Sequence, residues 1–314
     1  MDNSKLDKDM TYDVLIVGGG PAGLNSALYL KRKGWNVGII AKDIGGQVID
    51  TSTVENYLGI PAISGMGLIE KFVEHVKELN IPIGEFITVE DIKMSDSTNV
   101  KEILTDEGTF KAKSIIIATG SKPRKLNVPG EAEYSGKGVA YCAICDGPLF
   151  AGEDIIVSGG GNTAIEAAID LSKIAKTVTV VHRSQFRADK ILLDILEKSE
   201  NVKFKLNTQI QEITGDKMMT GINVLDKDEN QSYTIPASGI FVEIGNLPNS
   251  SPFKDLIHLN SKGEIIVDKF GATNVKGIFA AGDITDSPYN QIIISAGEGA
   301  TTALAVNDYL NSLK

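Results

Sequence analysis

The feature that most limits the fold of this chain is one local pattern that occurs twice. In each copy an apolar run is followed by a glycine-rich turn, an amphipathic helix and a second apolar run; the copies span 12–40 and 154–181. This order is typical of the βαβ unit of dinucleotide-binding folds. Continuous apolar runs such as 14–17 and 155–157 are typical of parallel strands buried on both faces. We therefore predict an α/β protein with two Rossmann-like, three-layer dinucleotide-binding domains.

The two copies predict corresponding elements. For the first copy we expect a strand at 12–17, a turn at 18–23, a helix at 24–33 and a strand at 37–40. For the second copy we expect a strand at 154–158, a turn at 159–164, a helix at 165–174 and a strand at 177–181. Two such units in one chain indicate two nucleotides, or one nucleotide and a relic of a second site.

Two breaks in the apolar pattern predict the domain boundaries. Lys122-Pro123-Arg124 follows an apolar run at 114–118, and Gly245-Asn246-Leu247-Pro248-Asn249 precedes the last apolar run, at 277–283. We predict that residues 122–248 form a domain inserted into the first one. Residues 1–121 and 249–314 then form one split domain.

The turn at 18–23 fits the pattern G-x-G-x-x-G between a strand and a helix. In this pattern the first glycine makes the turn, the second lets the backbone approach a pyrophosphate, and the third lets the helix pack closely. The alternative is a structural turn without a ligand. The acid expected at the end of the second strand is absent, because Ala41 and Lys42 occupy that place and Asp43 lies beyond it. How the adenosine ribose would be held therefore stays open.

The turn at 159–164 fits G-x-G-x-x-A, and its second strand is followed by His182, Arg183 and Arg187. An acid at this place would bind the ribose hydroxyl of NADH, whereas cations suit the 2′-phosphate of NADPH. A solvated surface is the alternative for these basic residues. Because histidine is largely neutral at pH 7, Arg183 and Arg187 are the two dependable cations. We predict a preference for NADPH, with NADH as a possible second donor.

The only two cysteines of the chain are Cys142 and Cys145, and Asp146 follows them. The spacing allows a disulfide in which one thiolate attacks and the other resolves. The neighbouring carboxyl could move a proton to or from a thiol. Half of a metal site and coincidence are the alternatives, but two cysteines and three scattered histidines do not provide the usual spacing of zinc ligands. We predict a redox pair and no metal.

Composition excludes several other classes of protein. The net charge is −10 and no run is rich in Lys or Arg, which argues against nucleic acid as a partner. No apolar run approaches the length of about 18 residues that spans a bilayer, and Met1–Met10 lacks the apolar core of a secretory signal. We therefore expect a cytoplasmic protein, in which a Cys-x-x-Cys pair is more often redox-active than structural.

These motifs together resemble the low-molecular-weight bacterial thioredoxin reductases, and equally the C-terminal flavoprotein part of the alkyl hydroperoxide reductase flavoprotein subunit. The similarity extends over nearly the whole chain after Tyr12. It is carried by the segments GGGPAG at 18–23, GGQ at 45–47, VENYLG at 54–59, ATG at 118–120, CAICDGPLF at 142–150, GGGNTAIEAA at 159–168, GIFVEIGNLPN at 239–249 and GIFAAGDITDSPYNQIIISAGEGA at 277–300.

The resemblance implies FAD in the split domain, a nicotinamide nucleotide in the inserted domain, a homodimer, and rotation of the inserted domain about hinges near 122 and 248. It implies that Cys145 faces the flavin, that Cys142 attacks the partner disulfide and that Asp146 is the acid. The residues expected to bind FAD are Gly18, Gly20, Pro21, Ala22, Gly23, Gly45, Gly46, Gln47, Asn56, Thr119, Gly120, Asp283, Gln291 and Ile292. The residues expected to bind the nicotinamide nucleotide are Gly159, Gly161, Asn162, Thr163, Ala164, His182, Arg183 and Arg187.

Two departures bear on function. Thioredoxin reductases of this type read H-R-R before a later Arg, whereas this chain has one Arg fewer and is one residue shorter between His182 and Arg187. The hydroperoxide reductase relatives carry an N-terminal dithiol domain, and we expect this chain to begin at the flavin domain. The expected partner is thioredoxin, or a glutaredoxin-like carrier of a peroxide-reducing system served by NADH. A flavin-binding regulatory protein without chemistry is a third alternative, which the intact cysteines and glycine turns disfavour.

Overall fold

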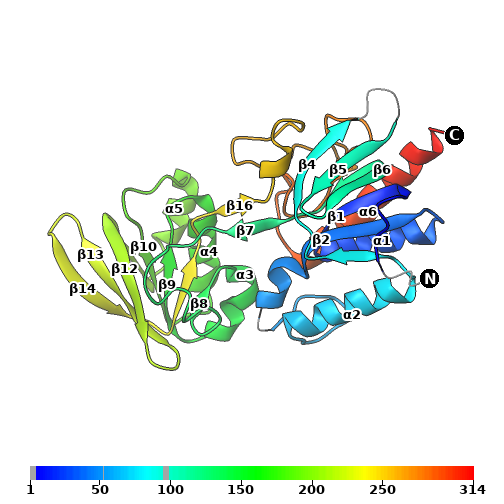
Figure 1. The fold of residues 1–314 in the computed structure, drawn as a ribbon. Coiled ribbons are helices and arrows are strands. Elements are labelled where there is room, and N and C mark those ends of the chain that lie inside the picture. The colour runs from blue at the N-terminus through cyan, green and yellow to red at the C-terminus, as the bar shows by residue number, and fades with distance from the viewer. Residues whose placement is uncertain (1–4, 52, 95–98) are drawn as a thin grey trace. The chain divides into compact units, whose positions relative to one another are not determined.

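The computed structural model describes residues 5–51, 53–94 and 99–314, and its chain divides into two compact units (Figure 1). The split unit runs through Lys122 and resumes at Leu247, and the inserted unit is Pro123–Asn246. The observed boundaries of the inserted unit lie within two residues of the predicted ones, 122 and 248. Where the chain passes between the units, β7 (Ser121–Pro123) and β16 (Asn246–Pro248) pair as a two-stranded sheet.

The split unit is built on a seven-stranded sheet of order β3-β2-β1-β6-β5-β4, with β17 paired to β6. Its strands are β1 (Thr11–Gly19), β2 (Val37–Ile44), β3 (Ile83–Glu85), β4 (Val89–Met94), β5 (Lys101–Thr105), β6 (Gly108–Ile117) and β17 (Ile278–Ala280). The pairs around β1, β2, β3, β6 and β17 are parallel, whereas β4, β5 and β6 form an antiparallel meander. Its helices are α1 (Pro21–Arg32), α2 (Gly65–Glu78) and α6 (Ile292–Asn311), with short 3-10 turns η1 (Gly46–Asp50) and η3 (Ser251–Phe253).

Strand β1 shows why the run at 14–17 is apolar throughout. Val14 and Ile16 belong to one core cluster, which also holds the buried residues of α1 and α6. Leu15 and Val17 face the opposite cluster, which includes Phe253. Because successive side chains of a strand point to opposite faces, both faces of β1 are covered.

The inserted unit repeats this arrangement with a parallel sheet of order β11-β10-β9-β15-β8. Its strands are β8 (Val139–Ala140), β9 (Asp154–Ser158), β10 (Thr177–Val181), β11 (Val202–Lys205) and β15 (Gly239–Val242). Helices α4 (Asn162–Ser172) and α5 (Lys190–Leu196) accompany it, and β12 (Thr208–Gly215), β13 (Met219–Asp226) and β14 (Gln231–Pro236) form an antiparallel sheet.

The inserted unit has three layers. Ile155 and Val157 pack in the cluster that contains the apolar face of α4, whereas Ile156 packs in the cluster formed with the antiparallel sheet. The predicted fold class, α/β with two Rossmann-like three-layer dinucleotide-binding domains, the second inserted into the first, is confirmed.

The predicted elements of the two βαβ units are largely present. The strands at 154–158 and 177–181 have the predicted limits. Both helices begin three residues earlier than expected, at Pro21 and Asn162, because the glycine before each of them already takes the N-cap position. Strand β2 continues to Ile44 rather than ending at residue 40, and therefore includes Lys42 and Asp43.

Helix α6 lies beside α1 (Figure 1). Small residues let the two helices approach closely. A Cβ built on Gly299 would lie 2.2 Å from the carbonyl oxygen of Ala22, so only glycine allows this approach. The hydroxyl of Ser26 donates to the carbonyl of Ala22 over 2.7 Å and to the carbonyl of Gly299 over 3.0 Å. None of the helices formed by the described residues has the length and apolar character needed to cross a membrane.

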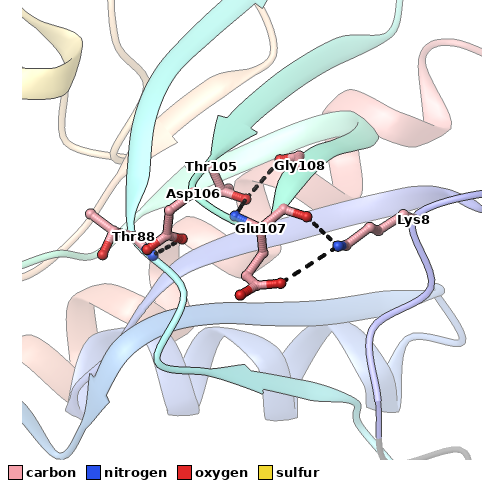
Figure 2. A network of polar contacts seen from close by, with 6 residues as sticks. All are labelled: Lys8, Thr88, Thr105, Asp106, Glu107 and Gly108. Atoms are coloured by element: carbon pink, nitrogen blue, oxygen red, sulfur yellow. Dashed lines mark hydrogen bonds and ion pairs between the residues drawn. The ribbon is translucent and has the colours of Figure 1, made fainter.

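A polar network fixes the turn between β5 and β6 (Figure 2). The hydroxyl of Thr105 donates to the carbonyl of Gly108 over 2.7 Å and accepts from the amide of Glu107 over 3.2 Å. Lys8 contacts both the carbonyl and the carboxylate of Glu107, and the Asp106 carboxylate accepts the Thr88 amide over 2.8 Å. These contacts tie the turn to neighbouring segments of the split unit.

Candidate active site

The first glycine turn has a separate steric requirement at each glycine. Gly18 has φ of +122°, and a Cβ there would lie 2.1 Å from the carbonyl oxygen of Ala118 at the end of β6. A Cβ on Gly23 would lie 2.1 Å from the carbonyl oxygen of Gly18. At Gly20, by contrast, the described residues other than its neighbours along the chain place no heavy atom within 4 Å of the Cβ position. The turn therefore packs tightly on its protein side and is open at the glycine expected to face the pyrophosphate.

Segments distant in sequence meet at this turn, at the carboxyl end of the parallel strands. The amide of Gly45 donates to the carbonyl of Gly19 over 2.9 Å. A Cβ on Gly282 would lie 2.9 Å from the Cβ of Ala22, which places the end of β17 beside the first turn of α1. The next residue, Asp283, accepts the Ser295 hydroxyl over 2.9 Å. Burial raises the pKa of the Asp283 carboxyl above its usual value.

The remaining residues predicted for FAD lie in the split unit and take part in local contacts. Gln47 donates to the Ser121 hydroxyl over 3.3 Å, and Asn56 donates to the Gln291 side chain over 3.2 Å. Gln291 is the N-cap of α6, and Ile292 is the first residue of that helix. Thr119 donates a hydrogen bond to Asn249 and accepts one from it. Gly46 and Gly120 have positive φ.

Sequence reasoning missed one carboxylate near this edge. Glu298 of α6 accepts the amide of Gly282 over 2.9 Å and also accepts the hydroxyl of Ser287. Its position within the motif segment 277–300 is the signal that could have found it.

Lys42 and Asp43 are both exposed on β2.

The second glycine turn opens in the same way. Gly161 is the N-cap of α4, and no side chain of the described residues caps that helix. Apart from the chain neighbours of Gly161, no heavy atom among the described residues lies within 4 Å of its Cβ position. Unsatisfied amides at a helix start favour an anion. Asn162 donates to the Asp189 carboxylate over 2.8 Å, and the Asp189 amide donates back to Asn162 over 2.8 Å. Thr163 is exposed in the first turn, whereas Ala164 is buried.

The basic residues predicted for NADPH differ in their exposure. His182 is buried, and its ring would lie 2.4 Å from a Cβ on Gly160. Burial, together with Arg187 and Arg183, lowers the pKa of His182 below its usual value, so it is neutral at pH 7. Arg183 and Arg187 are exposed, and the Arg187 amide donates to the Gly160 carbonyl over 2.7 Å. This bond keeps the backbone of Arg187 beside the glycine turn.

Cys142 and Cys145 form a disulfide, with their Cα atoms 5.3 Å apart. Cys142 precedes the four-residue helix α3 (Ala143–Asp146), and Cys145 lies within it. The helix continues into the 3-10 turn η2 (Gly147–Phe150). Cys142 is the N-cap, and its sulfur accepts the amide of Cys145 over 3.2 Å. Burial raises the pKa of the Asp146 carboxyl to about 6. In the described ranges, no group of three or more His, Cys, Asp or Glu side chains could hold a metal ion.

A second carboxyl beside the disulfide was not predicted. Glu243 follows β15, and its Oε1 accepts the amide of Ala143 over 3.2 Å. Burial raises the pKa of Glu243 to about 7. An acid directly after the buried run of β15 is the signal that could have singled it out.

Two dinucleotide-binding units, one of which is inserted into the other and carries a close disulfide, define the disulfide oxidoreductase class of α/β proteins. The profile of the family described as "Pyridine nucleotide-disulphide oxidoreductase" matches residues 12–303. The chain therefore belongs to this family. The resemblance to thioredoxin reductases and to the hydroperoxide reductase flavoprotein inferred from the motifs is confirmed.

Curated relatives match nearly the whole chain. "NADH dehydrogenase" of Bacillus subtilis (strain 168) is 45% identical over 311 residues, covering 98% of this chain and 60% of the relative. The alkyl hydroperoxide reductase F protein of Staphylococcus aureus (strain MRSA252) is 44% identical over 310 residues, covering 98% of this chain and 61% of the relative. The chain thus spans about three fifths of the length of these relatives.

Solved structures of thioredoxin reductases match the fold over nearly their full length. The enzyme of Streptococcus pyogenes MGAS5005 has a TM-score of 0.91 at 39% identity, with 96% of this chain and 99% of that chain covered. The enzyme of Giardia duodenalis has a TM-score of 0.89 at 31% identity, with 96% and 99% covered.

The family implies FAD and a nicotinamide cofactor, and the residues present fit both groups. Each glycine turn leaves open the side on which a pyrophosphate would lie, at Gly20 in the split unit and Gly161 in the inserted unit. Each turn also precedes a helix without a side-chain cap among the described residues.

Proposed function

We propose that this chain is an NAD(P)H-dependent flavoprotein disulfide reductase that reduces a small dithiol protein, most simply thioredoxin. The single observation that carries the proposal is the Cys142–Cys145 disulfide at the start of α3, in a unit that also has an open glycine turn. The other open turn, in the split unit, supports binding of a second nucleotide, FAD. A regulatory protein without chemistry would not need the redox pair and both open turns.

The chemistry that bound FAD supplies is the transfer of two electrons from the hydride of the nicotinamide to a disulfide. The Cys142–Cys145 bond takes up these two electrons and two protons and becomes a dithiol. Cys142 then attacks one sulfur of the partner disulfide, and Cys145 attacks the resulting mixed disulfide. The partner leaves as a dithiol, and the Cys142–Cys145 bond forms again.

The assignment of the two thiols follows the resemblance. Cys142 is proposed as the attacking thiol and Cys145 as the thiol that exchanges electrons with the flavin. The amide of Cys145, which donates to the Cys142 sulfur, would stabilise a thiolate on Cys142. This contact supports Cys142 as the nucleophile toward the partner.

Asp146 is proposed to supply and remove the protons of this exchange. With its pKa raised to about 6 by burial, the carboxyl can take up a proton closer to neutral pH than an exposed aspartate does. The fraction of protonated Asp146 falls as pH rises through 6. Proton donation by Asp146 should therefore weaken above this pH.

For the electron donor we propose a moderate preference for NADPH. The exposure of Arg183 and Arg187 after β10, and the hydrogen bond of the Arg187 amide to the turn, support contact of these cations with a 2′-phosphate. His182 adds no charge at pH 7, because its pKa is lowered. Asp189, which is hydrogen-bonded to Asn162, places a carboxylate near the same turn. Its negative charge would repel the 2′-phosphate of NADPH. These opposing groups support a weaker preference than two arginines alone would give.

A glutaredoxin-like carrier in a peroxide-reducing system is the second candidate partner. The similarity to a protein named "NADH dehydrogenase" and to an alkyl hydroperoxide reductase F protein favours it, with NADH as donor. Both candidates use the same thiol chemistry and differ in the protein that receives the electrons.

Reduction of purified partner proteins tests the proposal. The purified chain should contain FAD and should reduce thioredoxin disulfide with NADPH. Cys142→Ser and Cys145→Ser should abolish this turnover, whereas NADPH should still bleach the flavin absorbance in both variants. A protein that refuses FAD, or a cysteine variant with wild-type turnover, would refute the proposal. Parallel assays with a glutaredoxin-like dithiol protein and with NADH identify the preferred partner and donor.

A further inference from the structure

The main chain of Glu243 is fixed against the glycine turn of the inserted unit. Its amide donates to the carbonyl of Ser158, the last residue of β9, over 2.8 Å. Its carbonyl oxygen lies so close to Gly159 that a Cβ there would come within 2.4 Å of it. Glu243 therefore leaves the sheet at a fixed position at the carboxyl end of β15.

The side chain of Glu243 reaches from this position to the redox helix. Its Oε1 accepts the amide of Ala143, the first residue of α3 and the residue bonded to Cys142. The amide of Cys145 is accepted by the Cys142 sulfur, and the amide of Asp146 by the Cys142 carbonyl over 3.0 Å. Glu243, which follows β15, thus accepts the first amide of α3, and the N-cap Cys142 accepts the amides of Cys145 and Asp146.

We propose that Glu243 is a positioning residue for Cys142, which holds the first turn of α3 against the end of β15 and controls how readily the Cys142 thiol ionises. The inference rests on the proposed function in one respect, namely that the Cys142 thiolate is the group that attacks a partner disulfide. Glu243 holds α3 through the amide of Ala143 and acts on the Cys142 thiol through its charge.

The physical basis is the charge that Glu243 carries next to this amide. An ionised carboxylate close to Cys142 disfavours a thiolate, because like charges repel, whereas a protonated carboxyl does not. Burial raises the pKa of Glu243 to about 7, so its charge changes in the neutral range. The other titratable groups of α3 are Cys145 and Asp146, while β9 and its turn present main-chain groups. No ion pair of Glu243 is found within the described residues.

A purely structural hydrogen bond makes a different prediction. Glu243→Gln keeps an oxygen that can accept the Ala143 amide but has no charge, and Glu243→Ala removes the acceptor. If Glu243 only holds the helix, the Gln variant should behave as the parent protein and only the Ala variant should differ. If Glu243 also controls ionisation, both variants should differ from the parent.

The test is the rate at which iodoacetamide alkylates Cys142 between pH 5 and 9. It is measured in the holoprotein carrying Cys145→Ser, in which Cys142 is the only thiol of the chain. With Glu243 the profile should show a transition near pH 7 from its carboxyl, beside those of Asp146 near pH 6 and of the Cys142 thiol. Glu243→Gln should remove the transition near pH 7 and increase the rate at pH 7.5 about threefold to tenfold, which corresponds to a thiol pKa lower by roughly 0.5–1 unit. Glu229→Gln, an exposed change in the same unit, is the matched control.

Superimposable profiles for the parent protein and for Glu243→Gln would overturn the inference. If Glu243→Gln does not fold, Glu243→Asp keeps a carboxyl at shorter reach and should keep the transition of this carboxyl. A profile with only the transitions of Asp146 and of the thiol would also overturn the inference. Alkylation requires neither a nucleotide donor nor a partner protein. A wild-type protein that fails to reduce thioredoxin while the Gln variant still shifts the profile would refute the proposed function alone.

Discussion

The two glycine turns share one design and differ at its third position. In the split unit this position is Gly23, where a Cβ would lie 2.1 Å from a carbonyl oxygen. In the inserted unit it is Ala164, whose methyl group is buried against Gly159. Both turns are open at their middle glycine, Gly20 or Gly161. The third residue is therefore set by how closely each helix approaches its own turn, whereas the middle glycine meets no such steric limit in either unit.

The surroundings of the two turns differ more than the turns do. Two carboxyl groups, Asp283 and the half-buried Glu298, lie near the turn of the split unit. Exposed arginines, Arg183 and Arg187, lie near the turn of the inserted unit. The two βαβ units therefore share one backbone pattern, while segments outside each unit supply different charges around its turn.

The largest expected effect is that of Gly23→Ala. The added methyl group would meet the Gly18 carbonyl, which neither a rotamer change nor a small shift relieves, so we expect roughly 3 kcal/mol or more of destabilisation. The variant should lose FAD, which is measured by flavin absorbance and thermal unfolding. Gly20→Ala is the matched control: it adds a methyl group on the open side and should fold while binding FAD more weakly. A Gly23→Ala protein with a full complement of FAD would contradict the steric comparison.

Asp146→Asn should affect the thiol steps and leave the split unit unchanged. We expect the rate of dithiol–disulfide exchange to fall by roughly 10²- to 10⁴-fold, because proton transfer by a placed side chain contributes about that much. The pH dependence near 6 seen with Asp146 should disappear. Stopped-flow measurement of flavin reduction by NADPH and of turnover with thioredoxin separates the two half-reactions. Equal slowing of both would show that Asp146 acts on the fold instead.

Arg183→Ala tests the charge difference between the two turns. A charge-assisted contact to phosphate contributes roughly 1.5–3 kcal/mol, so kcat/KM for NADPH should fall about 10- to 100-fold. The value for NADH should change little. Asp189→Asn, which keeps an amide partner for Asn162, should shift the ratio the other way by a few fold. Equal losses for both nucleotides after Arg183→Ala would show that the arginine belongs to a solvated loop.

The smallest expected effect is that of Ala164→Gly, which converts the second turn into the first pattern. The change should cost the intrinsic preference of a helix for alanine and the loss of one buried methyl group, together roughly 2 kcal/mol. Urea unfolding followed by circular dichroism measures the difference. A loss as large as that of Gly23→Ala would mean that the third position is under the same constraint in both units.

The sequence predicted those parts of the fold that depend on neighbouring residues. Strands 154–158 and 177–181 were found at their expected limits, because buried parallel strands are apolar throughout. The helix starts at Pro21 and Asn162 were placed three residues late, since apolar periodicity does not mark the uncapped first turn. For the candidate site, the disulfide of Cys142 and the two open turns were predicted.

Contacts between distant segments could not be read from the sequence. Glu243 reaches Ala143 across 100 positions, and Asp189 reaches Asn162 across 27. Whether a carboxyl meets an amide in this way depends on the order of strands in a sheet and on the packing of helices against it. The pattern of a single segment does not contain this information.

By itself, the sequence determined that this chain forms two dinucleotide-binding units and one thiol pair. Glycine spacing, apolar runs and the Cys-x-x-Cys pair act over a few residues, and their physical requirements are local. Only the tertiary structure decided which charges surround each site. The raised pKa values of Asp146 and Glu243 arise from burial, and desolvation depends on everything packed around a carboxyl.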